Sequence, residues 1–155
     1  RQIISCFPDV STNIIMNKNY IEKKIKDHLS HYDEIMIAYL FGSFVKRDYF
    51  HDIDIAVYLK KDFDKNDLKK YPFGYESEYN SRLSHLLKTD IDFVVLNNAE
   101  ILLQQRVINN GKLLFSKDEK YRIHYENYIR KIYLDLEPLR KIQNYYLNLK
   151  ITNAR

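Results

Sequence analysis

The sequence predicts a small α+β domain, in which a mixed β-sheet is flanked by helices and followed by a C-terminal helical tail. The first observation is size, because 155 residues are enough for one hydrophobic core. The second is composition: apolar residues make up 45% and charged residues 30% of the chain, and Gly and Pro number only 3 each. The third is order, since short apolar runs typical of strands alternate with segments whose apolar residues recur at helical spacing.

The first predicted elements are a helix and a buried strand. Over residues 18–31, Ile21, Ile25 and Leu29 recur at helical spacing with lysines between them. The run EIMIAYLF that follows, at 34–41, is continuously apolar, which is typical of a buried strand.

A short turn and an acidic strand come next. The segment GSFVKRDYFH at 42–51 is predicted to be a turn with one helical turn at most, and DIDIAVYLK at 52–60 a second strand. Side chains alternate between the faces of a strand, so Asp52 and Asp54 share one face while Ile53 points to the other. Two acidic groups this close repel each other and are costly to bury, so the pair either lies at a wet surface or faces a positive group.

The rest of the chain continues the alternation after a polar loop at 61–74, in which Pro72 and Gly74 are breakers. The next predicted elements are a helix at 75–88, a strand at 90–96, a helix at 99–111 and a short strand at 112–116. Residues 118–150 are predicted to be helical, with a break or kink forced by Pro138.

Charge and cysteine content narrow the classes of function. The formal net charge is +4, from 25 basic and 21 acidic residues, which is too mildly basic to predict nucleic-acid binding but suits an anionic ligand such as a nucleotide. Cys6 is the only cysteine, so no disulfide can form within the chain and a reducing, cytoplasmic location is expected. No apolar run reaches the length of a membrane span, so no membrane partner is expected.

The paired carboxylates indicate metal-assisted chemistry at phosphorus. Asp52 and Asp54 point the same way, and Mg²⁺ accepts one or two carboxylates together with phosphate oxygens. Two such ions can clamp an in-line displacement, and a third carboxylate from a neighbouring strand can take the proton of the attacking hydroxyl. Strand 90–96 offers Asp90 and Asp92, of which Asp92 is favoured because it lies further inside the strand.

The turn before the acidic strand has the composition of a phosphate-binding segment. Gly42 lets a backbone approach an anion without a Cβ in the way, and Ser43 offers a hydroxyl and a backbone N–H. If a helix starts here, its N-terminus adds a favourable field for an anion, and Lys46 and Arg47 are then expected to reach a triphosphate. Each feature has an ordinary alternative: a solvated strand edge, a simple turn and an exposed charge pair. Their occurrence together, in this order, favours the catalytic interpretation.

The segment LFGSFVKRDYFHDIDIAV at 40–57 resembles the signature of the polymerase-β-like nucleotidyltransferase superfamily, which is Gly-Ser, a spacer and Asp-x-Asp. DIDFVVLNNA, followed by LLQQRVINNGKLLFSKD, resembles the minimal nucleotidyltransferase (MntA-type) branch, as does the ending YLDLEPLRKIQNYYL. The resemblance implies a polymerase-β-like nucleotidyltransferase fold in a single domain. Its core is expected at 16–117 and its packed helical tail at 118–150, with 1–15 as an extension, a processed segment or an alternative start.

Proteins of this branch are antitoxins encoded beside a HEPN-domain RNase toxin, and they use ATP and Mg²⁺ to transfer AMP to a tyrosine hydroxyl of the toxin. The resemblance therefore implies a cognate HEPN-domain toxin and ATP as partners, with two Mg²⁺ ions as cofactors. The residues implied are Asp52, Asp54 and Asp92 as catalytic and metal-binding acids, and Gly42, Ser43, Lys46 and Arg47 as nucleotide-binding residues.

Two features depart from the pattern of the branch: the spacer between Ser43 and Asp52 is shorter, at eight residues, and Arg47 replaces a small residue. Two other functions stay open. One is an antitoxin of the same fold that neutralises its toxin by covering it. The other is a nucleotidyltransferase with another acceptor, such as a small molecule or an RNA 3′ end. No direct nucleic-acid binding is expected, because the chain has no room for a separate RNA-binding domain.

Overall fold

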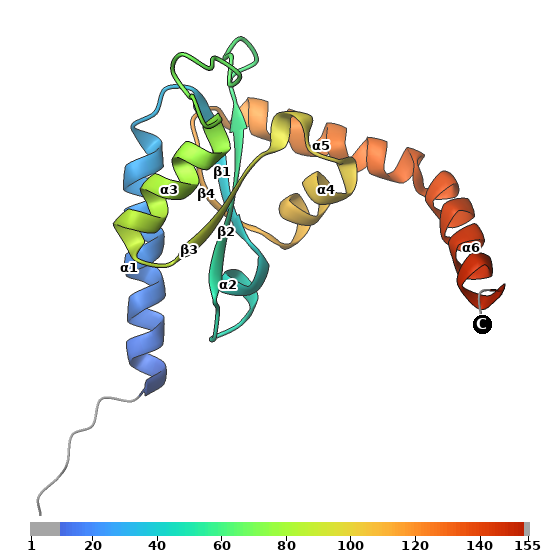
Figure 1. Ribbon diagram of the computed structural model, residues 1–155, viewed down its shortest axis with the longest axis horizontal. Helices are drawn as coiled ribbons and strands as arrows, with labels where there is room; N and C mark the ends of the chain where they lie inside the picture. The colour runs from blue at the N-terminus through green and yellow to red at the C-terminus, as the bar shows by residue number, and fades with distance from the viewer. Residues whose placement is uncertain (1–9, 154–155) are drawn as a thin grey trace, which may run out of the picture.

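The computed structural model describes residues 10–153 and shows a four-stranded sheet with helices on both faces (Figure 1). The strands are β1 (Ile35–Phe41), β2 (Asp52–Leu59), β3 (Asp90–Val95) and β4 (Lys112–Ser116). They lie in the order β3-β2-β1-β4. β1 pairs antiparallel with β2 and β4, whereas β2 and β3 run parallel, so the predicted mixed sheet of an α+β fold is confirmed.

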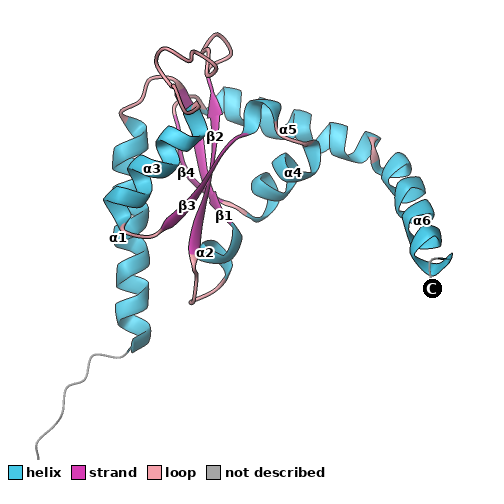
Figure 2. Cartoon of the chain, in the orientation of Figure 1, coloured by secondary structure: helices cyan, strands magenta, loops and turns pink. Residues whose placement is uncertain are grey.

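The α-helices lie broadly where the sequence predicted them, and a 3₁₀ turn at the end of the predicted strand 90–96 was not predicted (Figure 2). They are α1 (Val10–Ser30), α2 (Gly42–Lys46), α3 (Tyr75–Leu87), the 3₁₀ turn η1 (Leu96–Asn98), α4 (Ile101–Asn110), α5 (Glu119–Asp135) and α6 (Glu137–Asn153). The start of α1 differs from the expected residue 18, because VSTNIIMN at 10–17 is helical although it is rich in β-branched residues and Asn. This helix crosses the boundary expected at residue 16, and residues 1–9 of the expected extension lie outside the described residues.

One face of the sheet is covered by α1 and α3 (Figure 1). Ile25 and Leu29 of α1 and Tyr79 and Leu83 of α3 are buried in this core. Ile53 of β2 joins them and is fully buried, as the alternation of that strand predicted. The apolar side chains of β2 are thereby held in this core, so Asp52 and Asp54 must point to the opposite face of the sheet.

The opposite face is covered by α4 and α5. Val107 of α4 and Tyr125 and Ile129 of α5 pack here with Ala56 of β2. The hydroxyl of Tyr39 on β1 donates a 2.9 Å hydrogen bond to Oε1 of Glu126 on α5, which ties the helix to the sheet. Asp52 and Asp54 share the face of Ala56 but lie at the N-terminal end of β2. There the side chain of Asp52 is exposed and that of Asp54 is half-buried.

The edge strand β3 is held by side chains of α3. The backbone N–H of Phe93 donates to Oδ1 of Asn80 at 2.7 Å, and that of Val95 donates to Oε1 of Glu76 at 3.3 Å. Strand edges normally leave such N–H groups unpaired. Here α3 occupies part of the outer edge of β3, so the strand is bonded on both sides.

The expected tail consists of two helices with different surroundings. α5 packs on the core, whereas α6 projects away from it in Figure 1, and its side chains from 141 to 149 are exposed. The break falls at Leu136, just before Pro138, which lacks an N–H and is tolerated only in the first turn of a helix. The division into a 16–117 core and a 118–150 tail stays a prediction.

Candidate active site

The site is built where β1 ends and α2 begins, directly beside the start of β2. Gly42 has a φ of +70°, a conformation that residues with a side chain rarely adopt. A Cβ on Gly42 would lie 1.8 Å from Oδ2 of Asp54. The missing side chain therefore makes room for a carboxylate of this chain, whereas the approach to phosphate that the sequence suggested stays a prediction.

Ser43 contacts both acids of the Asp-x-Asp pair. Its hydroxyl donates to Oδ1 of Asp52 at 3.3 Å, and its backbone N–H donates to the carboxylate of Asp54. Since a serine hydroxyl and an N–H are both donors here, one residue orients two carboxylates. The Gly-Ser turn and the acidic strand, which the sequence presents as separate motifs, are one hydrogen-bonded unit.

The third acid lies level with the pair. In the parallel register of β2 and β3, Asp54 is opposite Asp92 and Asp52 is opposite Asp90. Paired residues of parallel strands point to the same face, and neighbouring strands are about 4.8 Å apart. The structure therefore brings Asp92 beside Asp54, as expected, and places Asp90 beside Asp52.

Burial raises the pKa of Asp54 above its usual value, and the negative charges of Asp52 and Asp92 raise it further. The N–H of Ser43 acts in the opposite direction. Within the described part of the chain, none of these three acids forms an ion pair. No positive side chain among the described residues therefore balances the negative charge of the cluster. A bound cation would balance it.

The acids fit a cation that shares its ligands with a substrate. Among the residues that the structure describes, no group of three or more His, Cys, Asp or Glu side chains is arranged so that it could hold a metal ion. Mg²⁺ does not require one, since it commonly takes one or two carboxylates and completes its shell with water and phosphate oxygens. Asp52 and Asp54, with Asp92 beside them, suit that partial set of ligands.

Comparison with known proteins agrees with this geometry. Residues 23–120 match the family described as polymerase beta, nucleotidyltransferase. The chain belongs to the polymerase β nucleotidyltransferase family. The match contains the Gly-Ser turn, the Asp-x-Asp strand and Asp92, and the predicted polymerase-β-like nucleotidyltransferase fold is confirmed.

Relatives in this nucleotidyltransferase family include the protein adenylyltransferase MntA of Shewanella oneidensis. It is 29% identical over 106 residues, which cover 67% of this chain and 68% of that protein. A structure of a tri-AMPylated HEPN toxin of S. oneidensis in complex with MNT antitoxin contains a chain with 25% identity and a TM-score of 0.62; the match covers 86% of this chain and 98% of that one. A toxin–antitoxin structure with AMP-PNP matches with 26% identity and a TM-score of 0.65, covering 84% and 98%. The predicted resemblance to the MntA-type branch is confirmed.

The two predicted basic residues lie at the C-terminal end of α2, whereas the acids contact its start. Lys46 is the last residue of α2 and Arg47 caps it, and both are exposed. Within the described residues neither side chain forms an ion pair, so both are available to an anion. Their contact with a nucleotide stays a prediction.

Sequence reasoning missed Lys18, which reaches this turn from α1. Its ammonium donates a hydrogen bond to the carbonyl oxygen of Arg47. It also lies 5.4 Å from the ring centre of Phe44 and 5.7 Å from that of Phe50. No local pattern distinguishes it from the other lysines of the helix, because the contact depends on how α1 packs against a segment 29 residues further along the chain.

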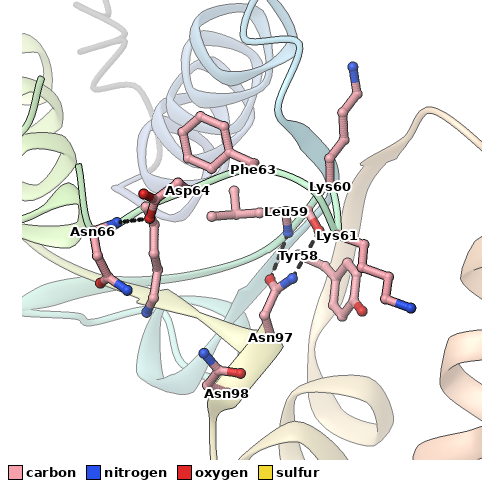
Figure 3. Close-up of a pocket in the computed structure, with 10 residues that line it drawn as sticks. Tyr58, Leu59, Lys60, Lys61, Phe63, Asp64, Asn66, Asn97 and Asn98 are labelled. Atoms are coloured by element: carbon pink, nitrogen blue, oxygen red, sulfur yellow. Dashed lines mark hydrogen bonds between the residues drawn. The ribbon is translucent and has the colours of Figure 1, made fainter.

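A polar pocket of about 270 Å³ lies at the other end of β2, around Tyr58 and Leu59 (Figure 3). Asn97 lines it, but its side chain accepts from the N–H of Leu59 at 2.8 Å and donates to the carbonyl of Leu59 at 2.9 Å. Lys65 is likewise paired with Glu76 at 3.3 Å. Asn97 therefore joins η1 to β2, Lys65 joins its loop to α3, and the acids of the candidate site lie at the opposite end of β2.

None of the helices in the described range 10–153 is long and apolar enough to cross a membrane.

Proposed function

We propose that this protein is an antitoxin that transfers AMP from ATP to a tyrosine hydroxyl of a cognate HEPN toxin. The observation that carries the proposal is the unit of Ser43, Asp52 and Asp54, with Asp92 level with Asp54 on the next strand. Catalysis at phosphorus needs acids held together before the substrate arrives, and this unit holds them. The relatives support a HEPN toxin as the acceptor of AMP, since they are a protein adenylyltransferase and antitoxins bound to HEPN toxins.

The proposed reaction is an in-line displacement. The tyrosine oxygen of the toxin attacks the α-phosphorus of ATP, the bond from that phosphorus to the bridging oxygen breaks, and pyrophosphate leaves. Asp92, which lies beside Asp54 on the exposed side of the site, accepts the phenolic proton. Two Mg²⁺ ions, held by Asp52, Asp54 and Asp92, would neutralise charge on the triphosphate.

In the proposal, the turn binds the triphosphate of ATP. Gly42 and Ser43 present their backbone at the start of α2, where a triphosphate would approach the acids. Lys46 and Arg47 would contact the distal phosphates, because both are exposed and unpaired among the described residues. A cytoplasmic location follows from the proposal, since ATP and an RNase toxin meet there.

A second candidate is an antitoxin that neutralises the toxin by binding alone. The exposed apolar side chains of α6 favour it, among them Leu139, Ile142 and Tyr145, which are 59%, 54% and 61% exposed. This candidate needs no catalytic acids, and the two functions are compatible in one protein. No contact of the described residues favours a small-molecule or RNA acceptor.

The experiment is intact-mass spectrometry of the toxin after incubation with this protein, ATP and Mg²⁺. We expect the toxin to gain one or more AMP groups, and Asp52→Asn combined with Asp54→Asn to abolish the gain. Asp62→Asn is the matched control, because Asp62 is an exposed loop residue away from the site. An unmodified toxin in a stable complex would reject the transfer and favour neutralisation by binding.

A further inference from the structure

We propose that Lys18 of α1 is a positioning residue of this site, which holds the 42–51 turn in the conformation that aligns the acids. The expected effect of Lys18 on the rate of AMP transfer rests on the proposed function, whereas its role in holding the turn does not. Lys18 contacts neither acid in the structure, and its contacts are with Phe44, Arg47 and Phe50 of the turn. It would therefore act through the turn and not on the reacting atoms.

The first contact is a hydrogen bond at the C-terminal end of α2. Carbonyl groups in the last turn of a helix have no partner within the helix and carry partial negative charge. The ammonium of Lys18 donates to the carbonyl of Arg47, the extended residue that directly follows the last turn of α2. A cation is the favoured partner at this end, so the contact holds the point where the chain leaves the helix.

The second contact is with two aromatic rings. Phe44 and Phe50 pack edge to face with their ring centres 4.7 Å apart, and the ammonium of Lys18 lies near both. Phe44 is 1% exposed and belongs to the core, so it gives the turn a rigid base. The lysine thereby joins the two halves of the turn to α1.

The turn is then held at its start and at its middle. Ser43 binds Asp52 and Asp54 at its start, and Lys18 binds Arg47 four residues later. Within the described residues, Lys18 forms no ion pair with Asp52, Asp54 or Asp92. This supports an effect of Lys18 on geometry, and separates it from a direct counter-ion to the acids.

The test compares Lys18→Met with Lys24→Met and Lys18→Arg. Lys24 is a matched control, because it lies on the same helix with its ammonium 4.7 Å from the ring centre of Tyr20, away from the turn. The first readout is kcat and KM for ATP in toxin modification. The second is the rate of trypsin cleavage after Arg47, mapped by mass spectrometry, which requires no transfer activity.

We expect Lys18→Met to lower kcat by about 10- to 100-fold with a smaller change in KM, because misplacing a reacting group by about 1 Å has effects of this size. It should also speed cleavage after Arg47. Lys18→Arg should restore both quantities, and Lys24→Met should behave as the unaltered protein. Circular dichroism checks that the helices persist, and Lys18→Gln replaces Lys18→Met if that variant does not fold.

Equal kcat and equal cleavage rates in Lys18→Met and Lys24→Met would overturn the inference. A change in KM alone would also overturn it, since that result indicates direct contact with the nucleotide. If the unaltered protein transfers no AMP, the proposed function fails, whereas the cleavage rates still decide whether Lys18 holds the turn.

Discussion

Gly42→Ala should abolish most of the transfer activity while the protein stays folded. The Cβ of alanine would lie 1.8 Å from Oδ2 and 2.6 Å from the carboxyl carbon of Asp54. To reach even a 3.0 Å contact, that oxygen must move by about 1.2 Å, which separates it from the N–H of Ser43. A displacement of this size costs about 100-fold in rate.

The stability effect is separable from the rate effect. Alanine at a positive φ costs about 1–2 kcal/mol, which for a chain of this length lowers Tm by about 2–8 °C. Gly74→Ala is the control, because Gly74 also has a positive φ, of +90°, but no heavy atom of the described residues apart from its chain neighbours lies within 4 Å of the Cβ position. It should lower Tm similarly and leave the rate unchanged.

The assay is the initial rate of AMP transfer to the toxin at saturating ATP, measured beside thermal unfolding of the same samples. A Gly42→Ala protein that retains a rate within threefold of the unaltered protein would refute the reasoning. It would mean that Asp54 works equally well in another position. A rate loss in Gly74→Ala as large as in Gly42→Ala would attribute the effect to general instability.

Three further predictions concern charge and the last helix. The raised pKa of Asp54 means that the folded state binds this proton more tightly than the unfolded state, so stability falls as pH rises through the range between the two pKa values. Asp54→Asn should therefore raise Tm at pH 7, and the gain should shrink towards pH 4; an unchanged Tm at pH 7 would contradict this. Mg²⁺ should raise the Tm of the unaltered protein but not of Asp52→Asn combined with Asp54→Asn, as seen in a thermal-shift titration. Deleting residues 137–155 should leave Tm and AMP-PNP binding unchanged and weaken toxin binding in calorimetry, because α6 buries little of its surface in the core; equal toxin affinity would reject a role for α6.

The strands and the acidic face of β2 could be predicted because they depend on local patterns. The period of two in β2 separates Ile53 from Asp52 and Asp54, and the structure keeps that separation. The break near Pro138 follows equally from a single residue whose ring and missing N–H exclude it from a helix interior. These features need no knowledge of the distant parts of the chain.

The remaining features of the site depend on distant contacts. Asp92 could be proposed, but its alignment with Asp54 is a matter of strand register, which a single strand does not encode. The space that Gly42 leaves for Asp54 and the reach of Lys18 to Arg47 arise only when separate elements pack. A sequence pattern therefore identifies the acids, whereas the contacts that orient them appear only in the fold.

The bonds from α3 to the outer edge of β3 have a consequence for how the acids stay aligned. Shifting β3 by one residue would turn Asp92 to the wrong face of the sheet and leave Asp54 without its neighbour. Such a slip would also break the bonds from Phe93 to Asn80 and from Val95 to Glu76. These bonds therefore oppose a shift in the register of β3. They also occupy part of that edge, so another polypeptide cannot add a strand there.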